Sequence, residues 1–159
     1  MMRRKLDLVA VGGTFDRLHR GHMALLSKAF MVGKKVVIGV SSDPFVQTMH
    51  KKHEVQAYED RVLEIRKFLC KNQFEDRAIF VPLDDPYGPT VTDAGIEGIV
   101  VSRETHATTE EINKLRRTRG LRPLRVFTVD LVLAQDGRPI SSTRIRLREI
   151  DQEGITAEK

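Results

Sequence analysis

The chain has 159 residues and a net charge of +5, from 27 basic and 22 acidic side chains. Hydrophobic residues make up 40% of it and charged residues 31%, which is typical of a globular protein and excludes a disordered or fibrous one. The apolar runs are too short to span a bilayer, and the basic N-terminus lacks the apolar region of a signal peptide. We therefore expect a cytoplasmic protein without a membrane partner.

The basic charge balance suits nucleic acid and small polyanionic substrates equally well. A cluster of cations between residues 114 and 125 contains no aromatic side chains, so we expect a solvated helix end there rather than an RNA-binding surface. No nucleic acid is expected as a partner. The single cysteine, Cys70, excludes an internal disulfide and is expected to be buried in a helix.

Strand-like and helix-like patterns alternate along the chain. This alternation predicts an α/β fold, a Rossmann-like doubly wound parallel sheet of five strands with helices on both faces. Residues 1–154 are expected to form a single domain, followed by a frayed polar tail over 155–159. The predicted strands span 6–11, 35–40, 78–83, 98–102 and 124–133; the predicted helices span 21–32 (closed by Gly33), 58–71, 108–119 and a last helix that Ser141 opens.

The first strand runs into residues 12–22, GGTFDRLHRGH. The two glycines allow a sharp turn and a close approach to a ligand, and Gly21 leaves room for a phosphate. His19 and His22 are three residues apart, so both rings can face one site at a helix N-terminus, where the dipole favours an anion. This pattern predicts a phosphate site; the alternative is a glycine turn with two incidental histidines. No third ligand for zinc is evident.

Near the other end of the chain, residues 140–146 read ISSTRIR. Ser141 or Ser142 can cap the last helix, and the hydroxyls of Ser142 and Thr143 can meet β- or γ-phosphate oxygens. Arg144 and Arg146 add fixed positive charge suited to phosphate. The alternative is an ordinary cap with solvent-facing arginines. Because both segments follow strands, they are expected to meet beyond the carboxyl ends of the sheet and hold one triphosphate from two sides.

The HxGH sequence at 19–22 and the ISSTxxR sequence at 140–146 resemble the motifs of the nucleotidyltransferase superfamily. Segments between them resemble the archaeal and eukaryotic type of phosphopantetheine adenylyltransferase, and the resemblance covers about residues 5–154. It implies transfer of the adenylyl group of ATP to 4'-phosphopantetheine, giving dephospho-coenzyme A and pyrophosphate. It also implies Mg²⁺ with ATP, held mainly by substrate oxygens and water. The middle segments are 84–90, 99–105, 120–124 and 136–139.

The resemblance also implies roles for individual residues. The acceptor phosphate is already a nucleophile at pH 7, so the protein has to position two anions and stabilise developing charge. Three of these roles have alternatives. Lys51 could take the place of Lys52 at the reacting phosphates, and the loop that contains Tyr87 could be a plain turn rather than a wall for the acceptor. Thr105 could cap the next helix rather than lie near the nucleotide. The catalytic residues implied are His19, His22, Lys52 and Arg146; the ATP-binding residues are Gly12, Gly13, Thr14, Phe15, Gly21, Ser102, Glu104, Ser141, Ser142 and Thr143; the acceptor-binding residues are Thr14, Lys52, Asp85 and Tyr87.

Other functions share part of this pattern. A cytidylyltransferase shares the first motif but has a different string before its second, where this chain has DGRP at 136–139. A flavin or nicotinamide mononucleotide adenylyltransferase would share the mechanism with another acceptor. A non-catalytic nucleotide sensor should have lost one of the phosphate residues, and an RNA binder should show steep salt dependence. A class I aminoacyl-tRNA synthetase shares HxGH but is longer and has a lysine-rich second signature.

Overall fold

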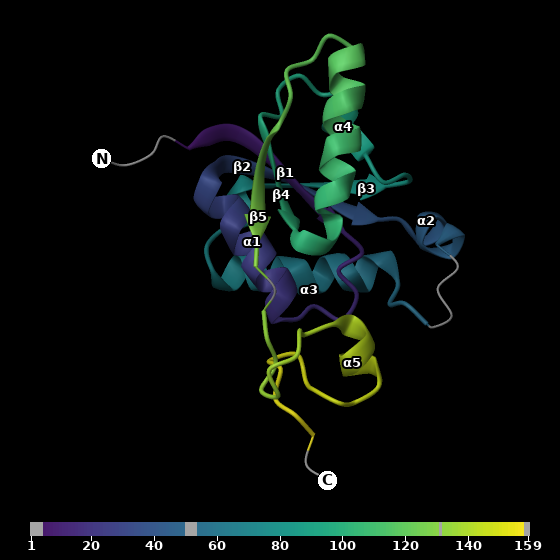
Figure 1. Ribbon diagram of the computed structural model, residues 1–159. Helices are drawn as coiled ribbons and strands as arrows, with labels where there is room; N and C mark the ends of the chain where they lie inside the picture. The colour runs from purple at the N-terminus through teal and green to yellow at the C-terminus, as the bar shows by residue number, and fades with distance from the viewer. Residues whose placement is uncertain (1–4, 50–53, 131, 158–159) are drawn as a thin grey trace.

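The computed structural model describes residues 5–49, 54–130 and 132–157, and it contains a five-stranded sheet of order β3-β2-β1-β4-β5 (Figure 1). Every neighbouring pair of strands is parallel. The predicted five-stranded parallel sheet is therefore confirmed. The strands are β1 (Leu6–Gly13), β2 (Gly33–Ser41), β3 (Ala78–Leu83), β4 (Gly98–Ser102) and β5 (Arg125–Val129).

Helices cover both faces of this sheet, as predicted (Figure 1). On β1, Val9 and Val11 point to one face and pack with α1 and α3, whereas Ala10 points to the other face and packs with α4. Among the described residues no helix is long and apolar enough to cross a membrane. The helices are α1 (Arg20–Val32), α2 (Asp43–Thr48), α3 (Tyr58–Lys71), α4 (His106–Thr118) and α5 (Ser142–Arg146), with short 3-10 turns η1 (Glu75–Arg77), η2 (Gly88–Val91) and η3 (Arg103–Thr105).

Several element boundaries differ from the sequence prediction, and three of the differences have a clear physical reason. The last strand ends at Val129 rather than 133, because its partner β4 ends at Ser102, which pairs with Val129. The short helix α2 was not predicted; it is only six residues long and is capped by the Ser42 side chain, so it carries no helical periodicity. Gly33 does close α1, but in an extended conformation that starts β2, where an added Cβ would lie 2.5 Å from Val9.

Two side chains on helices differ from expectation in their exposure. Cys70 lies on α3 and is exposed, not buried. Arg116, from the cluster expected to be a solvated helix end, is only 1% exposed. Its guanidinium donates hydrogen bonds to the carbonyls of Thr90 (2.7 Å) and Ile96 (3.2 Å), so it fastens the loop around η2 to α4. This loop forms one wall of the site described below.

Residues 132–157 form a small lobe that contains α5 (Figure 1). Its core is a separate cluster of Ala134, Ile140 and Ile150. The lobe contacts the start of α1, where the Arg20 N–H donates to the Gln152 carbonyl at 3.2 Å. Within the expected frayed tail, residues 155–157 are hydrogen-bonded, for example Ala157 N–H to the Glu149 carbonyl at 3.0 Å, which departs from that expectation.

Candidate active site

The loop between β1 and α1 is built around the buried carboxylate of Asp16, which is 3% exposed. Its Oδ1 accepts the Gln56 N–H at 2.9 Å, and its Oδ2 accepts from the Arg17 guanidinium at 2.7 Å. On either side of it, Phe15 and Arg17 adopt the left-handed conformation with φ of 56° and 48°. Such backbone is costly without glycine, so the contacts of Asp16 are what hold the loop in shape.

The two histidines of the first segment stack on each other at the N-terminus of α1, with ring centroids 3.8 Å apart. The Gly21 N–H donates to His19 Nδ1 at 3.0 Å, and the His19 N–H donates to His22 Nδ1 at 3.2 Å. Because both Nδ1 atoms accept hydrogen bonds, the proton of each neutral ring resides on Nε2. Each ring therefore offers one Nε2–H donor, and the backbone holds the rings in register.

Both imidazoles are neutral at physiological pH. Burial lowers the pKa of His22 from 6.5 to about 3, with a further contribution from neighbouring His19. Burial likewise lowers the pKa of His19 from 6.5 to about 4. A cation in this space would have to be desolvated, which disfavours protonation. The pair can thus donate hydrogen bonds to an anion without acting as fixed charges.

The second segment meets the first at Asp16, which confirms that the fold brings the two together. The Ser142 hydroxyl donates to the Asp16 backbone carbonyl at 2.5 Å, and Arg146 Nη1 lies 3.6 Å from Asp16 Oδ2. Arg146 Nη2 also donates to Thr143 Oγ1 at 3.0 Å. Ser141 caps α5 by accepting the Arg144 N–H at 3.2 Å. Hydroxyls and a guanidinium from α5 therefore lie beside the loop that ends in the histidine pair.

Arg144 does not take the phosphate-facing role expected from its charge. It is 9% exposed and forms an ion pair with Asp136. It also donates to the Pro139 carbonyl at 3.1 Å. Its guanidinium lies inside the C-terminal lobe, where these contacts organise the turn that precedes α5.

Arg61 is a buried residue of the site that sequence reasoning missed. Its side chain is fully buried and donates to the carbonyls of Thr14 and Ser41, each at 2.8 Å, and to Asp43 Oδ1 at 2.9 Å. It therefore ties the ends of β1 and β2 together. A signal was present: Arg61 shares the inward stripe of α3 with Ile65 and Leu69, at a spacing of four residues.

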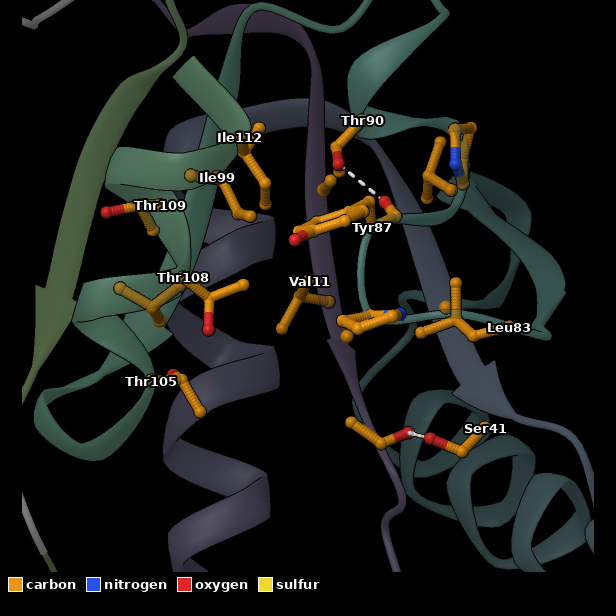
Figure 2. Close-up of a pocket in the computed structure, with 18 of the residues that line it drawn as sticks. Val11, Ser41, Leu83, Tyr87, Thr90, Ile99, Thr105, Thr108, Thr109 and Ile112 are labelled. Atoms are coloured by element: carbon orange, nitrogen blue, oxygen red, sulfur yellow. Dashed lines mark hydrogen bonds between the residues drawn. The ribbon is translucent and has the colours of Figure 1, made fainter. Parts of the chain in front are cut away.

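A pocket of about 250 Å³ opens next to the histidine loop, between the sheet and the wall formed by η2 and α4 (Figure 2). It extends along the sheet from the ends of β1 and β2 to Tyr87, and all of its described lining residues are uncharged. Apolar surface dominates, and the polar side chains in the lining are hydroxyls, among them those of Thr108 and Thr109 on α4. The lining includes Gly12, Gly13, Thr14, Ser41, Leu83, Tyr87, Thr90, Ile99, Thr105, Thr108, Thr109 and Ile112.

The remaining predicted residues are distributed around this pocket. Asp85 Oδ1 accepts the N–H groups of Tyr87 (2.8 Å) and Gly88 (2.7 Å), so it shapes the turn that places the Tyr87 ring. Ser102 pairs with Thr105 through its backbone N–H at 3.2 Å, just beside the lining. Glu104 is exposed on η3. Phe15 is buried against His22, with ring centroids 5.3 Å apart.

Two predicted residues, Lys51 and Lys52, lie outside the described part of the chain. The described residues place groups that can bind an anion next to an uncharged pocket. These groups are a helix N-terminus, two neutral imidazole donors and Arg146. This combination suits a polyphosphate and a second molecule with an extended uncharged body.

Comparisons with known proteins show to which family the chain is similar. The family description cytidylyltransferase-like matches residues 10–148. A phosphopantetheine adenylyltransferase of Methanothermobacter thermautotrophicus is 51% identical over 153 residues, covering 96% of this chain and 91% of the relative. Another, from Methanopyrus kandleri, is 49% identical over 144 residues, covering 91% of this chain and 90% of the relative.

Solved structures share the fold. A protein from Archaeoglobus fulgidus described as of unknown function superposes with a TM-score of 0.69 at 31% identity, covering 78% of this chain and 89% of that one. A pantoate-beta-alanine ligase from Francisella tularensis superposes with a TM-score of 0.60 at 12% identity, covering 91% of this chain and 67% of that one. At that identity the second likeness concerns the fold alone.

Proposed function

Because this chain belongs to the cytidylyltransferase-like family, and within it to the phosphopantetheine adenylyltransferases, we propose that the joined segments around Asp16 bind the triphosphate of ATP. In this proposal 4'-phosphopantetheine occupies the adjoining pocket. An oxygen of its phosphate attacks the α-phosphorus of ATP, and the bond from that phosphorus to the bridging oxygen breaks. The products are dephospho-coenzyme A and pyrophosphate.

The roles proposed for the described residues are those that the family motifs imply. His22 Nε2–H is assigned to the α-phosphate, where charge develops, and His19 Nε2–H to the β- and γ-phosphates. Thr143 and Arg146 are assigned to the departing pyrophosphate, and so is Ser142 through its backbone N–H, since its hydroxyl proton is donated to Asp16. Since the attacking phosphate is already anionic, the reaction needs no general base, and catalysis rests on positioning and charge stabilisation.

The glycine turn and the pocket residues complete the proposal. Gly12, Gly13 and Gly21 allow close approach of phosphate oxygens, and Thr14 donates to the α-phosphate or the acceptor phosphate. Tyr87, placed by Asp85, lines the acceptor arm, and Ser102 and Glu104 lie on the nucleotide side. Lys52, with Lys51 as the alternative, is assigned to the reacting phosphates on sequence alone.

Mg²⁺ enters in this proposal as part of the substrate, bound to ATP. Among the described residues, no group of three or more histidine, cysteine or acidic side chains gathers to hold a metal ion. Phosphate oxygens and water are the ligands that Mg²⁺ prefers in such a site. The small-molecule substrates follow from the family. A cytoplasmic location and the absence of a nucleic-acid partner stay predictions from the sequence.

The observation that carries the proposal is the joining of both phosphate segments at Asp16 beside an uncharged pocket. The test is to incubate the pure protein with ATP, Mg²⁺ and 4'-phosphopantetheine and to follow pyrophosphate and dephospho-coenzyme A together. We expect stoichiometric formation of both. Turnover only with CTP, or only with another acceptor, would keep the nucleotidyl transfer but show that the proposed substrate is wrong. Nucleotide binding without turnover of any combination of nucleotide and acceptor would favour a non-catalytic sensor.

A further inference from the structure

The surroundings of the pocket differ at its two ends. At one end lies Thr14, whose loop continues to Asp16, the ion-pair partner of Arg146, and to the neutral histidine pair. At the other end the Tyr87 ring lies across the pocket near Thr90, Ile99 and Ile112, and its hydroxyl points toward α4 (Figure 2). There it donates a hydrogen bond of 2.9 Å to Glu111 Oε2. The carboxylate of Glu111 thus lies beyond Tyr87, at the end of the uncharged lining that is remote from Thr14.

Two carboxylates, those of Asp85 and Glu111, accept hydrogen bonds at this remote end of the pocket. Asp85 is held by the backbone N–H groups of Tyr87 and Gly88, and Glu111 by the Tyr87 hydroxyl. The hydrogen bond to Glu111 raises the pKa of the Tyr87 hydroxyl, and the charges of Glu111 and Asp85 add to this effect. Tyr87 therefore stays a neutral donor turned toward Glu111, while the buried guanidinium of Arg116 on the same wall is engaged by backbone carbonyls, among them that of Thr90.

The length of the pocket places the tail of an acceptor at this end. Its lining follows β1 from Thr14 back to Ala10, which at about 3.3 Å per residue corresponds to roughly 13 Å. A molecule whose phosphate lies at Thr14 therefore extends its body between the sheet and α4. The end remote from the phosphate comes to lie at Tyr87 and its partner Glu111.

We propose that Glu111, held by Tyr87, selects acceptors by the charge of the end remote from their phosphate: a neutral or cationic end is accepted and a carboxylate is rejected. This inference rests on the proposed function. A carboxylate placed at this end would meet no cation in the described lining, and it would approach the like charges of Glu111 and Asp85 just outside that lining. A thiol or hydroxyl avoids this repulsion, and an ammonium group would be attracted to Glu111.

The test uses three acceptors of equal length: 4'-phosphopantetheine and its analogues with an amine or a carboxylate in place of the thiol. For each, kcat/KM is measured with Mg²⁺ and ATP, and Kd by titration calorimetry. Glu111→Gln removes the charge and keeps an oxygen that accepts from Tyr87. Glu110→Gln, the same change at the neighbouring exposed position, is the matched control. Thermal unfolding checks that both variants fold.

We expect the wild-type protein to discriminate strongly against the carboxylate analogue. In Glu111→Gln the ratio of kcat/KM for the carboxylate to that for the thiol should rise about tenfold, and the ratio for the amine should fall by a similar factor. Glu110→Gln should leave both ratios at their wild-type values. Unchanged ratios in Glu111→Gln, together with turnover of the thiol acceptor, overturn this inference alone. A wild-type protein that neither binds nor adenylylates any of the three overturns the proposed function along with it.

Discussion

The hydroxyl of Ser142 donates a hydrogen bond to the backbone carbonyl of Asp16, joining two segments that lie 126 residues apart in sequence. The side chain of the same Asp16 lies 3.6 Å from Arg146. Asp16 thus contacts the second segment through both its backbone and its carboxylate. The relative position of the histidine pair and α5 depends on these contacts, which makes Ser142 a direct way to test whether the two segments work together.

Ser142→Ala removes this link and leaves the Asp16 carbonyl without its partner. We expect kcat/KM for ATP to fall about tenfold and the free energy of unfolding to fall by about 1 kcal/mol, as for loss of one partly buried hydrogen bond. Steady-state kinetics and denaturant unfolding measure the two effects. Ser142→Thr keeps a hydroxyl and should restore most of the activity. Equal activity in wild type and Ser142→Ala would separate the second segment from ATP binding.

His22 is predicted to act through the donor at Nε2 rather than through its role in fixing His19. His22→Ala should lower kcat on the order of a hundredfold or more, as for loss of one transition-state donor. His22→Gln can present an amide N–H near the position of Nε2, whereas His22→Asn can only replace the acceptor at Nδ1. We therefore expect a higher kcat in the Gln variant than in the Asn variant. The reverse order would show that the backbone contact to His19 is what matters.

The local sequence pattern predicted most of the strands and helices, but it missed side-chain contacts between residues that are far apart in the sequence. The strand over 78–83 and the helix over 58–71 follow from apolar periodicity, and the structure has them with the same bounds. The sequence predicts a solvated helix end for Arg116 and a phosphate-facing side chain for Arg144, and it assigns no role to Arg61. Each is instead buried against backbone carbonyls. For Arg61 and Arg116 these carbonyls come from residues up to 47 positions away, and no local pattern shows that.

For the same reason the sequence could predict that the two phosphate segments lie close together, but not which of their side chains contact each other. Parallel strands bring their carboxyl ends to one edge, so both segments had to lie there. That Arg146 faces Asp16 while Arg144 turns into the C-terminal lobe depends on side-chain directions on the single turn of α5. The residues at the remote end of the pocket likewise meet only in the fold, since Tyr87 and Glu111 lie on different elements.

The neutral histidine pair predicts a specific dependence of stability on pH. Above pH 6.5 the two rings are neutral in both the folded and the unfolded chain, so they add no pH dependence. Below it the unfolded chain takes up protons while folded His19 resists until about pH 4 and folded His22 until about pH 3. The free energy of unfolding should therefore fall with decreasing pH, by at most about 1.4 kcal/mol per pH unit for each histidine.

Urea unfolding between pH 7.5 and 4 measures this slope. In His22→Gln the slope over that range should be smaller than in the wild type, because one of the two titrating groups is gone. Turnover offers an independent check: kcat should show no decline near pH 6.5 from protonation of these rings. An acid limb near pH 6.5 that disappears in His22→Gln would mean that His22 is protonated in the folded enzyme.

Gly21 is predicted to be required for activity and not for stability. A Cβ at this position would lie 2.8 Å from His19 Cε1 and 3.0 Å from His19 Nδ1, so Gly21→Ala must displace the ring. Alanine in the first turn of α1 favours the helix by up to about 1 kcal/mol over glycine. We expect kcat to fall at least tenfold while the melting temperature stays constant or rises. Full activity in a Gly21→Ala protein would show that His19 need not hold its stacked position.

Arg61 is predicted to fix the ends of β1 and β2, and with them the position of Thr14. Arg61→Ala would leave the carbonyls of Thr14 and Ser41 buried without donors, and we expect it to lower the free energy of unfolding by about 3–5 kcal/mol. Since such a loss can prevent folding, Arg61→Lys is the informative variant: an ammonium group can reach one carbonyl but cannot bridge both in a planar fork. It should fold, with a raised KM for ATP because Thr14 is no longer fixed.

Lys67→Ala, which removes an exposed cation on the same helix, should change stability by less than about 0.5 kcal/mol. If Arg61→Lys matched the wild type in both KM and stability, the bridge between β1 and β2 would have no part in positioning the phosphate loop.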